Sequence, residues 1–366
     1  MIAKEIIDAI EQFASPLYQE SYDNCGLQVG NMNDEVKGVL LSLDVTESIV
    51  DEAIQRGCNM IVAHHPVIFS GVKKIIGRTY VERIIQKAIK NDINIYAAHT
   101  NLDNVRNGVN AKIAEKLGLK NTAILSVKTN TLSKLYTYAP LDVADKVRNA
   151  LFEAGAGSVG NYAECSFNIN GAGTFKPGTQ ANPAIGMAGG AREELNEVKI
   201  EVLVEKHREG QVLKALFENH PYEEVAYELI ALQNPNQEIG SGMVGFLPNP
   251  MEETEFLKFL KESMKTNCIR HTALLNKKIH KIAICGGAGS FLLKDAIAAK
   301  ADVFITGDFK YHQFFDAEGR IIIADIGHYE SEQFTVEIFE AILKKKFPNF
   351  APLLSGLSTN PIKYFC

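Results

Sequence analysis

The sequence predicts an α/β protein whose mainly parallel-sheet domain is built in two halves and interrupted by an α+β insertion. Short apolar segments alternate with amphipathic segments over residues 1–127 and again after residue 234. This alternation is typical of βαβ units and a parallel sheet. Residues 128–234 follow a different order of strands and helices. We therefore expect one domain from residues 1–127 and 235–366, and a second from residues 128–234.

The first half is predicted to hold three buried strands separated by helices. The run Met60–Ala63 is apolar throughout, as expected for a strand buried on both faces of a parallel sheet. Thr46 is a suitable N-cap for the helix before it. Residues 22–30 are polar and are expected to form a loop. The predicted helices cover residues 2–14, 46–56, 80–90 and a segment ending at 117–118, and the predicted strands cover residues 36–43, 60–63 and 93–98.

The segment after residue 127 shows the order β-α-β-β-α-β. This is the order of a ferredoxin-like unit. A loop rich in Gly, Pro and Ala lies at its centre, over residues 171–190, and residues 233–237 resemble an exit linker. The predicted strands cover residues 134–138, 161–169, 198–204 and 225–232, and the predicted helices cover residues 143–154 and 209–219.

The α/β pattern then resumes to the end of the chain. A glycine-rich turn at residues 286–290 separates a strand from a helix, and it lacks both the Lys of a P-loop and the third glycine of a dinucleotide fingerprint. We interpret it as a tight turn, with phosphate binding as the weaker alternative. The predicted strands cover residues 279–285, 303–306 and 320–325, and the predicted helices cover residues 291–300 and 331–345.

Composition excludes several classes of function. The net charge of −6 over 366 residues argues against a broad nucleic-acid surface. No apolar run is long enough to cross a bilayer, and the N-terminus lacks the pattern of a signal peptide. The six cysteines are scattered without a Cys-x-x-Cys pair, which suits neither a disulfide framework nor a thiolate zinc site. We expect a cytoplasmic protein without membrane contact.

Chemically useful side chains follow several of the predicted strands. Asp44 follows one strand, and the pairs His64–His65, His99–Asp103 and His328–Glu332 follow or lie near the ends of others. The carboxyl ends of parallel strands meet at one edge of a sheet, so these groups can converge. Glu332 lies four residues after His328, which places both on one face of a helix.

These groups predict a metal site with nitrogen and oxygen ligands. Three imidazoles and two carboxylates exceed the needs of one tetrahedral zinc with an open position, and they suit two ions about 3.5–4 Å apart. Adjacent side chains at a strand end diverge, so we expect the two neighbouring histidines to serve different ions, with Glu332 as the bridge. Zinc, iron, manganese and cobalt all accept such ligands. The predicted metal ligands are His64, His65, Asp103, His328 and Glu332.

Three further residues are candidates for proton transfer. His99 is open to three interpretations, as a ligand, as a packed residue at a strand end, or as a group that supports the ligands, and we favour the last. Asp308 and His312 lie four residues apart after a strand, where they form either a proton-transfer pair or a surface ion pair. His207, His220, His271 and His280 lie in polar stretches and are expected at the surface.

The assembled motifs resemble the GTP cyclohydrolase I type 2 homologue family, the Nif-three-like proteins. The resemblance covers both halves of the chain in the family's order. It implies a dinuclear site at the five predicted ligands, a ring-like homohexamer, and a PII-like or CutA-like domain over about residues 128–234. The matching segments are Asp23–Gly30, Ala63–Pro66, His99–Asp103, Cys285–Gly289, Thr306–Asp308 and Gly327–Glu332.

Two classes of function follow from these expectations. The first is a metal-dependent hydrolase that acts on a small molecule, a nucleotide or phosphoester, in the manner of a GTP cyclohydrolase I type 2 protein. His99, Asp308 or His312 would then carry protons. The alternative is a non-catalytic protein, either for metal storage and delivery or for PII-like sensing through the insertion.

Overall fold

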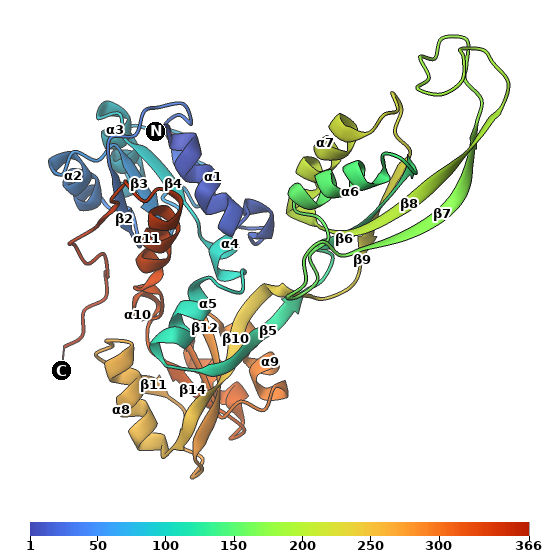
Figure 1. Cartoon of the computed structure of the whole chain (residues 1–366). Helices are drawn as coiled ribbons and strands as arrows, with labels where there is room; N and C mark the ends of the chain where they lie inside the picture. Colours follow the sequence, from blue (N-terminus) through green and yellow to red (C-terminus); the bar gives the residue numbers. More distant parts are fainter. Residues whose placement is uncertain (366) are drawn as a thin grey trace. The chain divides into compact units, whose positions relative to one another are not determined.

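The computed structural model describes residues 1–365 and divides into two compact units. Residues 1–127 and 238–365 form the first, which we call the two-sheet unit, and residues 128–237 form the second, the inserted unit. The second segment of the two-sheet unit begins at residue 238, where the sequence suggested residue 235. Figure 1 follows the chain through both units.

The first sheet of the two-sheet unit has the strand order β1-β4-β3-β2-β15. Strands β4, β3, β2 and β15 run parallel, and β1 pairs antiparallel with β4 at the edge. The loop prediction was wrong for β1, because this half-exposed edge strand lacks an apolar run and is defined by its pairing. Its strands are β1 (Gly26–Val29), β2 (Val39–Ser42), β3 (Met60–Ala63), β4 (Asn94–Ala97) and β15 (Leu353–Leu354).

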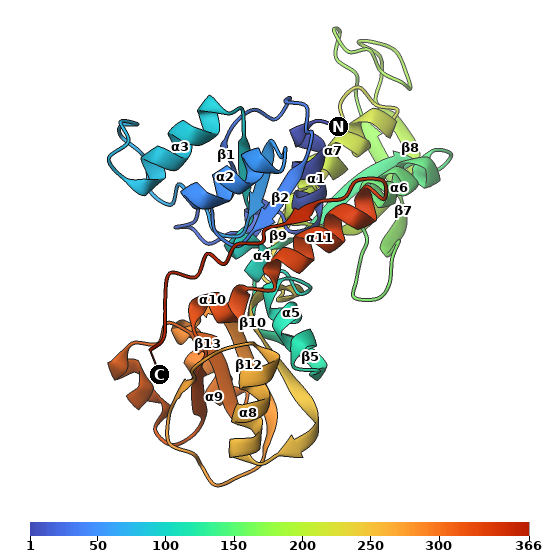
Figure 2. The same ribbon diagram turned by 90° about the vertical axis from the view of Figure 1, so that its left-hand side faces the viewer.

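Helices cover both faces of this sheet, as Figures 1 and 2 show. Alternate strand residues point to opposite faces, so Leu40 and Ile61 pack under α2 and α3, while Leu41 and Val62 pack under α1 and α11. Thr46 caps α2, since its hydroxyl accepts the Ile49 N–H at 3.3 Å. These helices are α1 (Ala3–Phe13), α2 (Glu47–Gln55), α3 (Tyr80–Lys90) and α11 (Thr335–Lys346).

The second sheet has the order β11-β14-β13-β12-β10-β5. Strands β12, β13 and β14 run parallel at its centre, and β10 and β11 pair antiparallel with their neighbours. The sequence did not predict β5, β10 or α8, and β10 begins inside the expected exit linker. The elements are β5 (Lys120–Lys128), β10 (Asn236–Met251), β11 (Arg270–His271), β12 (Ile279–Ala288), β13 (Val303–Gly307), β14 (Ile322–Asp325), α5 (Val109–Lys116), α8 (Glu253–Ser263) and α9 (Leu293–Ala298).

One hydrophobic core joins the two sheets of this unit. It runs from Leu41 and Val62 of the first sheet to Ile284 and Ile305 of the second, with Ile113 of α5 between them. Two short helices follow strand ends of the two sheets: α4 (Thr100–Asp103) follows β4, and α10 (His328–Glu332) follows β14. The shared core therefore holds strand ends from both sheets in one rigid frame.

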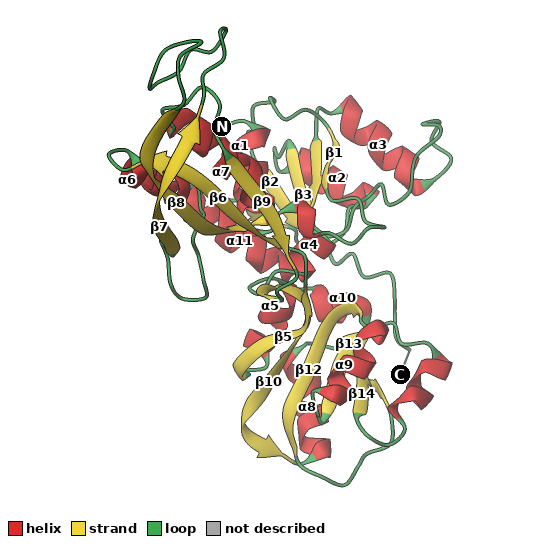
Figure 3. Ribbon diagram, turned by 90° about the vertical axis from the view of Figure 1, so that its right-hand side faces the viewer, coloured by secondary structure: helices red, strands yellow, loops and turns green. Residues whose placement is uncertain are grey.

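The inserted unit has a four-stranded sheet with the order β7-β8-β6-β9 (Figure 3). Its strand pairs are antiparallel, and α6 and α7 pack on Leu135, Ile200 and Val202. Strand β7 extends into the segment expected as a Gly/Pro/Ala-rich loop, because backbone pairing continues through its glycines. The elements are β6 (Leu132–Pro140), α6 (Ala144–Glu153), β7 (Ser166–Phe175), β8 (Glu193–Glu205), α7 (Glu209–Asn219) and β9 (Tyr227–Leu232).

Among residues 1–365, no helix is long and apolar enough to cross a membrane. The five cysteines in this described part are free thiols. Short 3₁₀-helices complete the fold: η1 (Pro16–Tyr18), η2 (Lys206–Arg208), η3 (Ser290–Leu292) and η4 (Tyr311–Ala317).

Candidate metal centre

The two adjacent histidines after β3 have separate hydrogen-bond partners. Both backbone N–H groups donate to the Leu43 carbonyl, at 3.1 and 3.0 Å, which fixes the turn. The buried His64 ring contacts the Ala98 carbonyl through Nδ1 at 2.8 Å, and His65 Nδ1 contacts Asp44 Oδ1 at 2.7 Å. The two ring planes are tilted by 47° and their centroids lie 4.9 Å apart, and the assignment of the two rings to different ions stays a prediction.

Helix α10 supplies His328 and Glu332, which lie one turn apart. The Nδ1 atom of His328 contacts Asp308 Oδ2 at 2.8 Å, and its Nε2 atom lies 3.2 Å from His65 Nε2. Glu332 Oε2 lies 3.0 Å from His65 Nε2 and 3.1 Å from His328 Nε2. Its other oxygen, Oε1, lies 3.8 Å from His64 Nε2. The Glu332 carboxylate thus faces three imidazoles.

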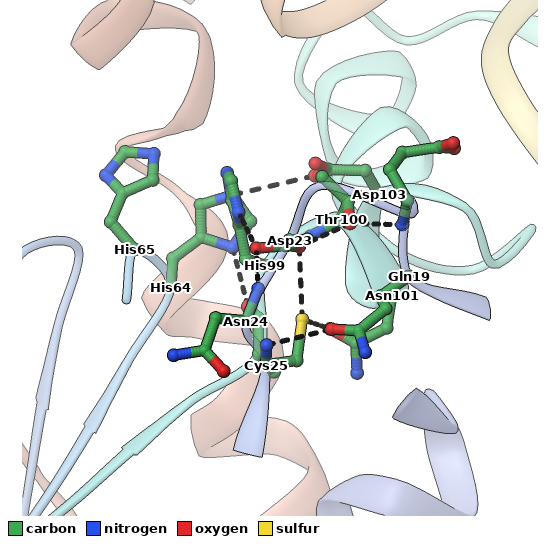
Figure 4. A network of polar contacts seen from close by, with 12 residues as sticks. Gln19, Asp23, Asn24, Cys25, His64, His65, His99, Thr100, Asn101 and Asp103 are labelled. Carbon is green, nitrogen blue, oxygen red and sulfur yellow. Dashed lines mark hydrogen bonds and ion pairs between the residues drawn. The ribbon is translucent and has the colours of Figure 1, made fainter. Parts of the chain in front are cut away.

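Asp103, at the end of α4, completes the cluster. Its Oδ1 atom lies 3.6 Å from His64 Nε2, and Figure 4 shows its carboxylate directed at that ring. Two overlapping groups result, each with ligand atoms within 4.8 Å of one another, and Glu332 belongs to both. These groups are His64–Asp103–Glu332 and His65–His328–Glu332, and a third comprises His64, His65 and His99.

Hydrogen bonding fixes the tautomer of each ring. Carbonyl and carboxylate oxygens only accept, so Nδ1 of His64, His65 and His328 must carry the proton. In the neutral rings, the lone pairs of Nε2 therefore face each other and Glu332. Within residues 1–365, His64 Nε2, Asp103 Oδ1 and Glu332 Oε2 are buried without a hydrogen-bond partner. Such a set of bare donor atoms fits metal ions, and the carboxylate–histidine contacts are those that orient metal ligands.

The electrostatics of the cluster show the same demand for positive charge. Burial lowers the pKa of His64 to about 4 and keeps this ring neutral. Burial also opposes a charge on His65 and His328, but the neighbouring carboxylates outweigh it and raise their pKa values to about 10 and 11. Burial and the Glu332 charge raise the pKa of Asp103, whereas His328 overcomes burial and lowers that of Glu332. Cations, either protons or metal ions, must balance these buried carboxylates.

The glycine-rich segment after β12 makes room for Glu332. Gly287 has a φ of +61°, and a Cβ atom there would lie 2.4 Å from Glu332 Oε1. Side chains already bind its backbone: the N–H groups of Gly286, Gly287 and Gly289 donate to Asn110, Ser331 and Thr306 at 3.0, 2.9 and 2.9 Å. These donors are therefore committed within the protein, which favours a structural turn over a phosphate cradle.

His99 is held by a carboxylate that our sequence reasoning did not assign. Its Nδ1 atom contacts Asp23 Oδ1 at 2.8 Å, and the other oxygen of Asp23 accepts the Thr100 N–H at 3.0 Å and the Thr100 hydroxyl (Figure 4). Burial opposes ionisation of Asp23, but these hydrogen bonds lower its pKa below the usual range. The His99 ring lies 5.3 Å, centroid to centroid, from both His64 and His65. The sequence offered one signal for this residue: Asp23 is an acidic side chain in the segment Asp23–Gly30, to which we had assigned no chemical role.

The structure separates the other two proton-transfer candidates. Asp308 adopts a left-handed backbone with φ of 57°, an unfavourable conformation for a non-glycine residue, and it binds His328. The His312 ring lies on η4 and contacts Tyr311 and Phe315. Asp308 lines the cavity beside the histidine cluster, whereas His312 is not among the described residues that line it.

A cavity of about 550 Å³ opens onto the cluster. Its wall carries the exposed aromatic rings Tyr22, Phe69 and Phe291, while amides, including Asn104 and Asn110, lie deeper. The volume lies within the range of small-molecule sites, and flat aromatic rings beside amides suit a planar, polar ligand.

Comparisons with known proteins agree on one family. The model of the Duf34/NIF3 (NGG1p interacting factor 3) family matches residues 1–361. The chain is 40% identical over 365 residues to the "GTP cyclohydrolase 1 type 2 homolog" of Halalkalibacterium halodurans, covering 98% of each protein. It is 38% identical over 367 residues to the protein of that name from Bacillus subtilis, covering 99% of this chain and 98% of that protein.

A solved structure extends this similarity to three dimensions. A "Bacillus cereus protein related to NIF3" superposes with a TM-score of 0.88 at 38% identity, covering 100% of this chain and 99% of that one. The resemblance found in the motifs is confirmed. The chain belongs to the Duf34/NIF3 family.

Proposed function

We propose that this protein binds two divalent metal ions and uses them to hydrolyse a nucleotide or phosphoester. One observation carries the proposal: three imidazoles are fixed through Nδ1 so that their Nε2 atoms converge, with two carboxylates, on one buried space. A group of buried acceptors without donors is unfavourable in a protein interior unless cations occupy it.

In this proposal, His64 and Asp103 would hold one ion and His65 and His328 the other, with Glu332 available to both. This assignment is supported by the two overlapping groups that share Glu332. Ions held there supply Lewis acidity toward water and toward an oxygen atom of the substrate. Zinc, iron, manganese and cobalt all suit nitrogen and carboxylate ligands.

Hydrolysis also needs groups that move protons, because water must lose one and the leaving group must gain one. We assign this role to His99. Its Nδ1–H donates to Asp23, so its Nε2 atom is the proton acceptor and faces the cavity beside His64 and His65. Asp308 holds His328 and acts through that ring. His312 carries no step here, since its ring contacts Tyr311 and Phe315 instead of the cavity.

The substrate class follows from the cavity wall and from the relatives. Tyr22 and Phe69 form an aromatic pair with centroids 6.3 Å apart, against which a flat ring can stack. Two curated relatives carry the name GTP cyclohydrolase 1 type 2 homolog. A purine nucleotide is therefore the first substrate to test.

The decisive experiment is turnover by protein loaded with each of the four metals under anaerobic conditions. GTP, other nucleotides and phosphoesters are incubated with the parent protein and with the His99→Gln variant, and products are separated by chromatography. Metal-dependent turnover that His99→Gln slows supports the proposal. Two bound ions without turnover of any compound would contradict hydrolysis and favour metal storage or delivery.

The inserted unit supports a second candidate function, sensing in the manner of a PII-like or CutA-like domain. The supporting observation is its β-α-β-β-α-β chain order with the strand order β7-β8-β6-β9, which we interpret as ferredoxin-like.

A deletion of the inserted unit tests this second function. Gly240 lies against Ser126 and Val127, so a two-residue Asn-Gly turn can replace residues 128–237 and join β5 to β10. Turnover that survives this deletion identifies the unit as accessory, and lost regulation identifies it as the sensor.

We also propose a homohexamer, as the family resemblance implies. The exposed edge strand β7 supports an interface, because Phe167 is 63% exposed and Ile169 is 44% exposed on it. Light scattering of the parent and of Phe167→Glu tests this: six chains for the parent and fewer for the variant are expected. A monomeric parent would contradict the proposal.

A further inference from the structure

The inserted unit contains a cavity of its own, of about 380 Å³. It lies where the ends of β7 and β8 meet the segment after α7, and all of its lining residues belong to this unit. The rings of Tyr138, Phe175 and Tyr222 line it, and the Phe175 and Tyr222 centroids are 6.5 Å apart. Its volume lies within the range of small-molecule sites.

A chain of hydrogen bonds fixes the Tyr222 ring in this wall. Buried His220 donates from Nε2 to the Tyr138 carbonyl at 2.9 Å and accepts the Tyr222 N–H at Nδ1, at 3.2 Å. The two rings meet edge to face at 4.8 Å. The Tyr222 hydroxyl donates to Glu197 Oε1 at 2.9 Å. Both ring nitrogens of His220 are therefore used to hold an aromatic wall, and our expectation of a surface position for His220 was wrong.

Gly173 places the Glu197 carboxylate at the cavity. A Cβ atom on Gly173 would lie 1.9 Å from Glu197 Oε2, so any side chain there would displace the carboxylate. Glycine weakens a strand, and here it leaves room for this acidic group.

The Gly/Pro/Ala-rich loop forms the opposite wall and is tied down by a second carboxylate. The Asn182 N–H donates to Glu223 Oε1 at 2.7 Å, and the Gly189 N–H donates to the Gly178 carbonyl at 2.9 Å. Pro177, Pro183 and Ile185 of this loop line the cavity. The loop thus closes an apolar wall against the tyrosines.

The charged side chains that line this cavity indicate which class of ligand it binds. The lining carries three carboxylates, Glu197, Glu223 and Glu224, against one cation, Lys176. Two of these carboxylates already accept hydrogen bonds from protein donors, unlike the bare oxygens of the metal centre. Aromatic faces beside negative charge attract an organic cation, both through the ring quadrupole and through Coulomb attraction.

We propose that this cavity is a binding site for an organic cation with a flat apolar body, such as an aromatic amine. The cation lies near Glu197 and Glu223, and its apolar body lies between Tyr222 and the proline-containing loop. The site is independent of the metal centre and of its proposed reaction.

The experiment measures binding of three indoles that differ in charge to the full chain. Tryptamine is the cation, tryptophol the neutral analogue and indole-3-acetate the anion. The protein contains no Trp, so indole emission reports the probe alone when excitation avoids tyrosine. We expect tryptamine to bind about tenfold more tightly than tryptophol, indole-3-acetate to bind most weakly, and choline to displace tryptamine.

Charge-neutral variants locate the site. Glu197→Gln keeps an acceptor for Tyr222 but removes the charge, and we expect tryptamine affinity to fall about tenfold. Glu194→Gln is the matched control: it lies on the same strand, is exposed and is absent from the lining, and affinity should stay unchanged. Circular dichroism checks folding, and Glu223→Gln decides the question if Glu197→Gln does not fold.

Several outcomes would overturn the proposal. Equal affinity for all three indoles would reduce the cavity to an apolar pocket, and tighter binding of indole-3-acetate would reverse the charge argument. Failure of both tryptamine and choline to bind would refute the cation site. Tryptamine affinity that is unchanged in folded Glu197→Gln and Glu223→Gln would place the probe elsewhere.

Discussion

The two cavities of this protein use similar residues for different purposes. Both are lined by carboxylates and aromatic rings and have a histidine in or beside the wall, but they differ in whether the polar atoms already have partners. At the candidate metal centre, His64 Nδ1 donates to a backbone carbonyl and Nε2 has no hydrogen-bond partner. In the inserted unit, both ring nitrogens of His220 form hydrogen bonds with the backbone. A ring with one bare nitrogen can bind a metal, and a ring with none can only support its neighbours.

The carboxylates repeat this contrast. Asp103 Oδ1 and Glu332 Oε2 are buried without a hydrogen-bond donor, whereas Glu197 and Glu223 accept from a hydroxyl and from a backbone N–H. Burial makes the difference decisive, because an unpaired charge costs far more in a protein interior than near water. On these two proposals, unsatisfied acceptors separate the candidate metal centre from the candidate site for an organic molecule better than residue types do.

The Glu332→Ala variant tests the candidate metal centre most strongly and has the largest expected effect. The substitution removes the carboxylate that both groups share, so each ion would lose a negatively charged ligand. We expect a loss on the order of a thousandfold in affinity for each ion. Elemental analysis after dialysis measures the metal content. Glu330→Gln is the control, since Glu330 binds Asn360 and its variant should keep the metal. A folded Glu332→Ala protein with parental metal content would exclude this residue from the site.

Asp23→Asn separates catalysis from metal binding. The Asn amide can either accept from Nδ1–H of His99 or donate to a bare Nδ1, so the proton on that ring is no longer fixed at Nδ1. We expect kcat for the hydrolysed nucleotide to fall about 100-fold, with KM and metal content nearly unchanged. Cys58→Ser, a buried thiol remote from the cavity lining, controls for general damage to the fold. Loss of metal in Asp23→Asn would show instead that His99 is a ligand.

Asp44→Asn and Asp308→Asn test the oxygen partners of the two ligand rings. Each aspartate accepts from Nδ1 of one histidine, His65 or His328. We expect each variant to lower the affinity for metal about tenfold, because these contacts orient the ring and raise its basicity. Competition with a chromophoric chelator gives the affinities. Parental affinity in both would mean that the rings are oriented by packing alone.

Much of the candidate metal centre could be predicted from the sequence because the predicted ligands follow strand ends. Apolar strands such as β3 are recognisable, and the carboxyl ends of parallel strands share an edge, so convergence of His64 with Asp103 can be predicted. Asp23 could not be assigned this way, since it lies in a loop before the edge strand β1 and reaches His99 through tertiary contact. The sequence predicts the strand ends well and the supporting loops poorly.

Three cases show where local patterns are insufficient. Asp308 and His312 were paired by their four-residue spacing, but Asp308 has a left-handed backbone and the 3₁₀-helix begins only at Tyr311. His220 lies in a polar stretch, yet it is buried by a long-range hydrogen bond to the Tyr138 carbonyl and by its neighbour Tyr222. Strand β5 at the edge of the second sheet and its neighbour β10 were missed because backbone pairing defines them more than apolar composition does.

The smallest predicted effect concerns pH and sharpens the contrast between histidines. Burial lowers the pKa of His220 below its ordinary 6.5, while the carboxylates raise the pKa of His65 and His328. The folded inserted unit therefore prefers neutral His220, whereas the unfolded chain takes up a proton as pH falls below 6.5. The stability that His220 contributes is present above pH 6.5 and declines below it.

His220→Gln isolates this contribution, because the amide can accept the Tyr222 N–H and donate to the Tyr138 carbonyl without titrating. Between pH 6.5 and 5, we expect the parent to lose stability more steeply than the variant, by at most about 1.4 kcal/mol per pH unit. Hydrogen exchange of α7 and β9, compared between the two proteins at each pH, measures the local stability of the inserted unit. Equal pH dependence in parent and variant would mean that His220 accepts a proton without loss of its contacts. Its ring would then resemble the titratable rings of the metal centre more than a fixed structural support.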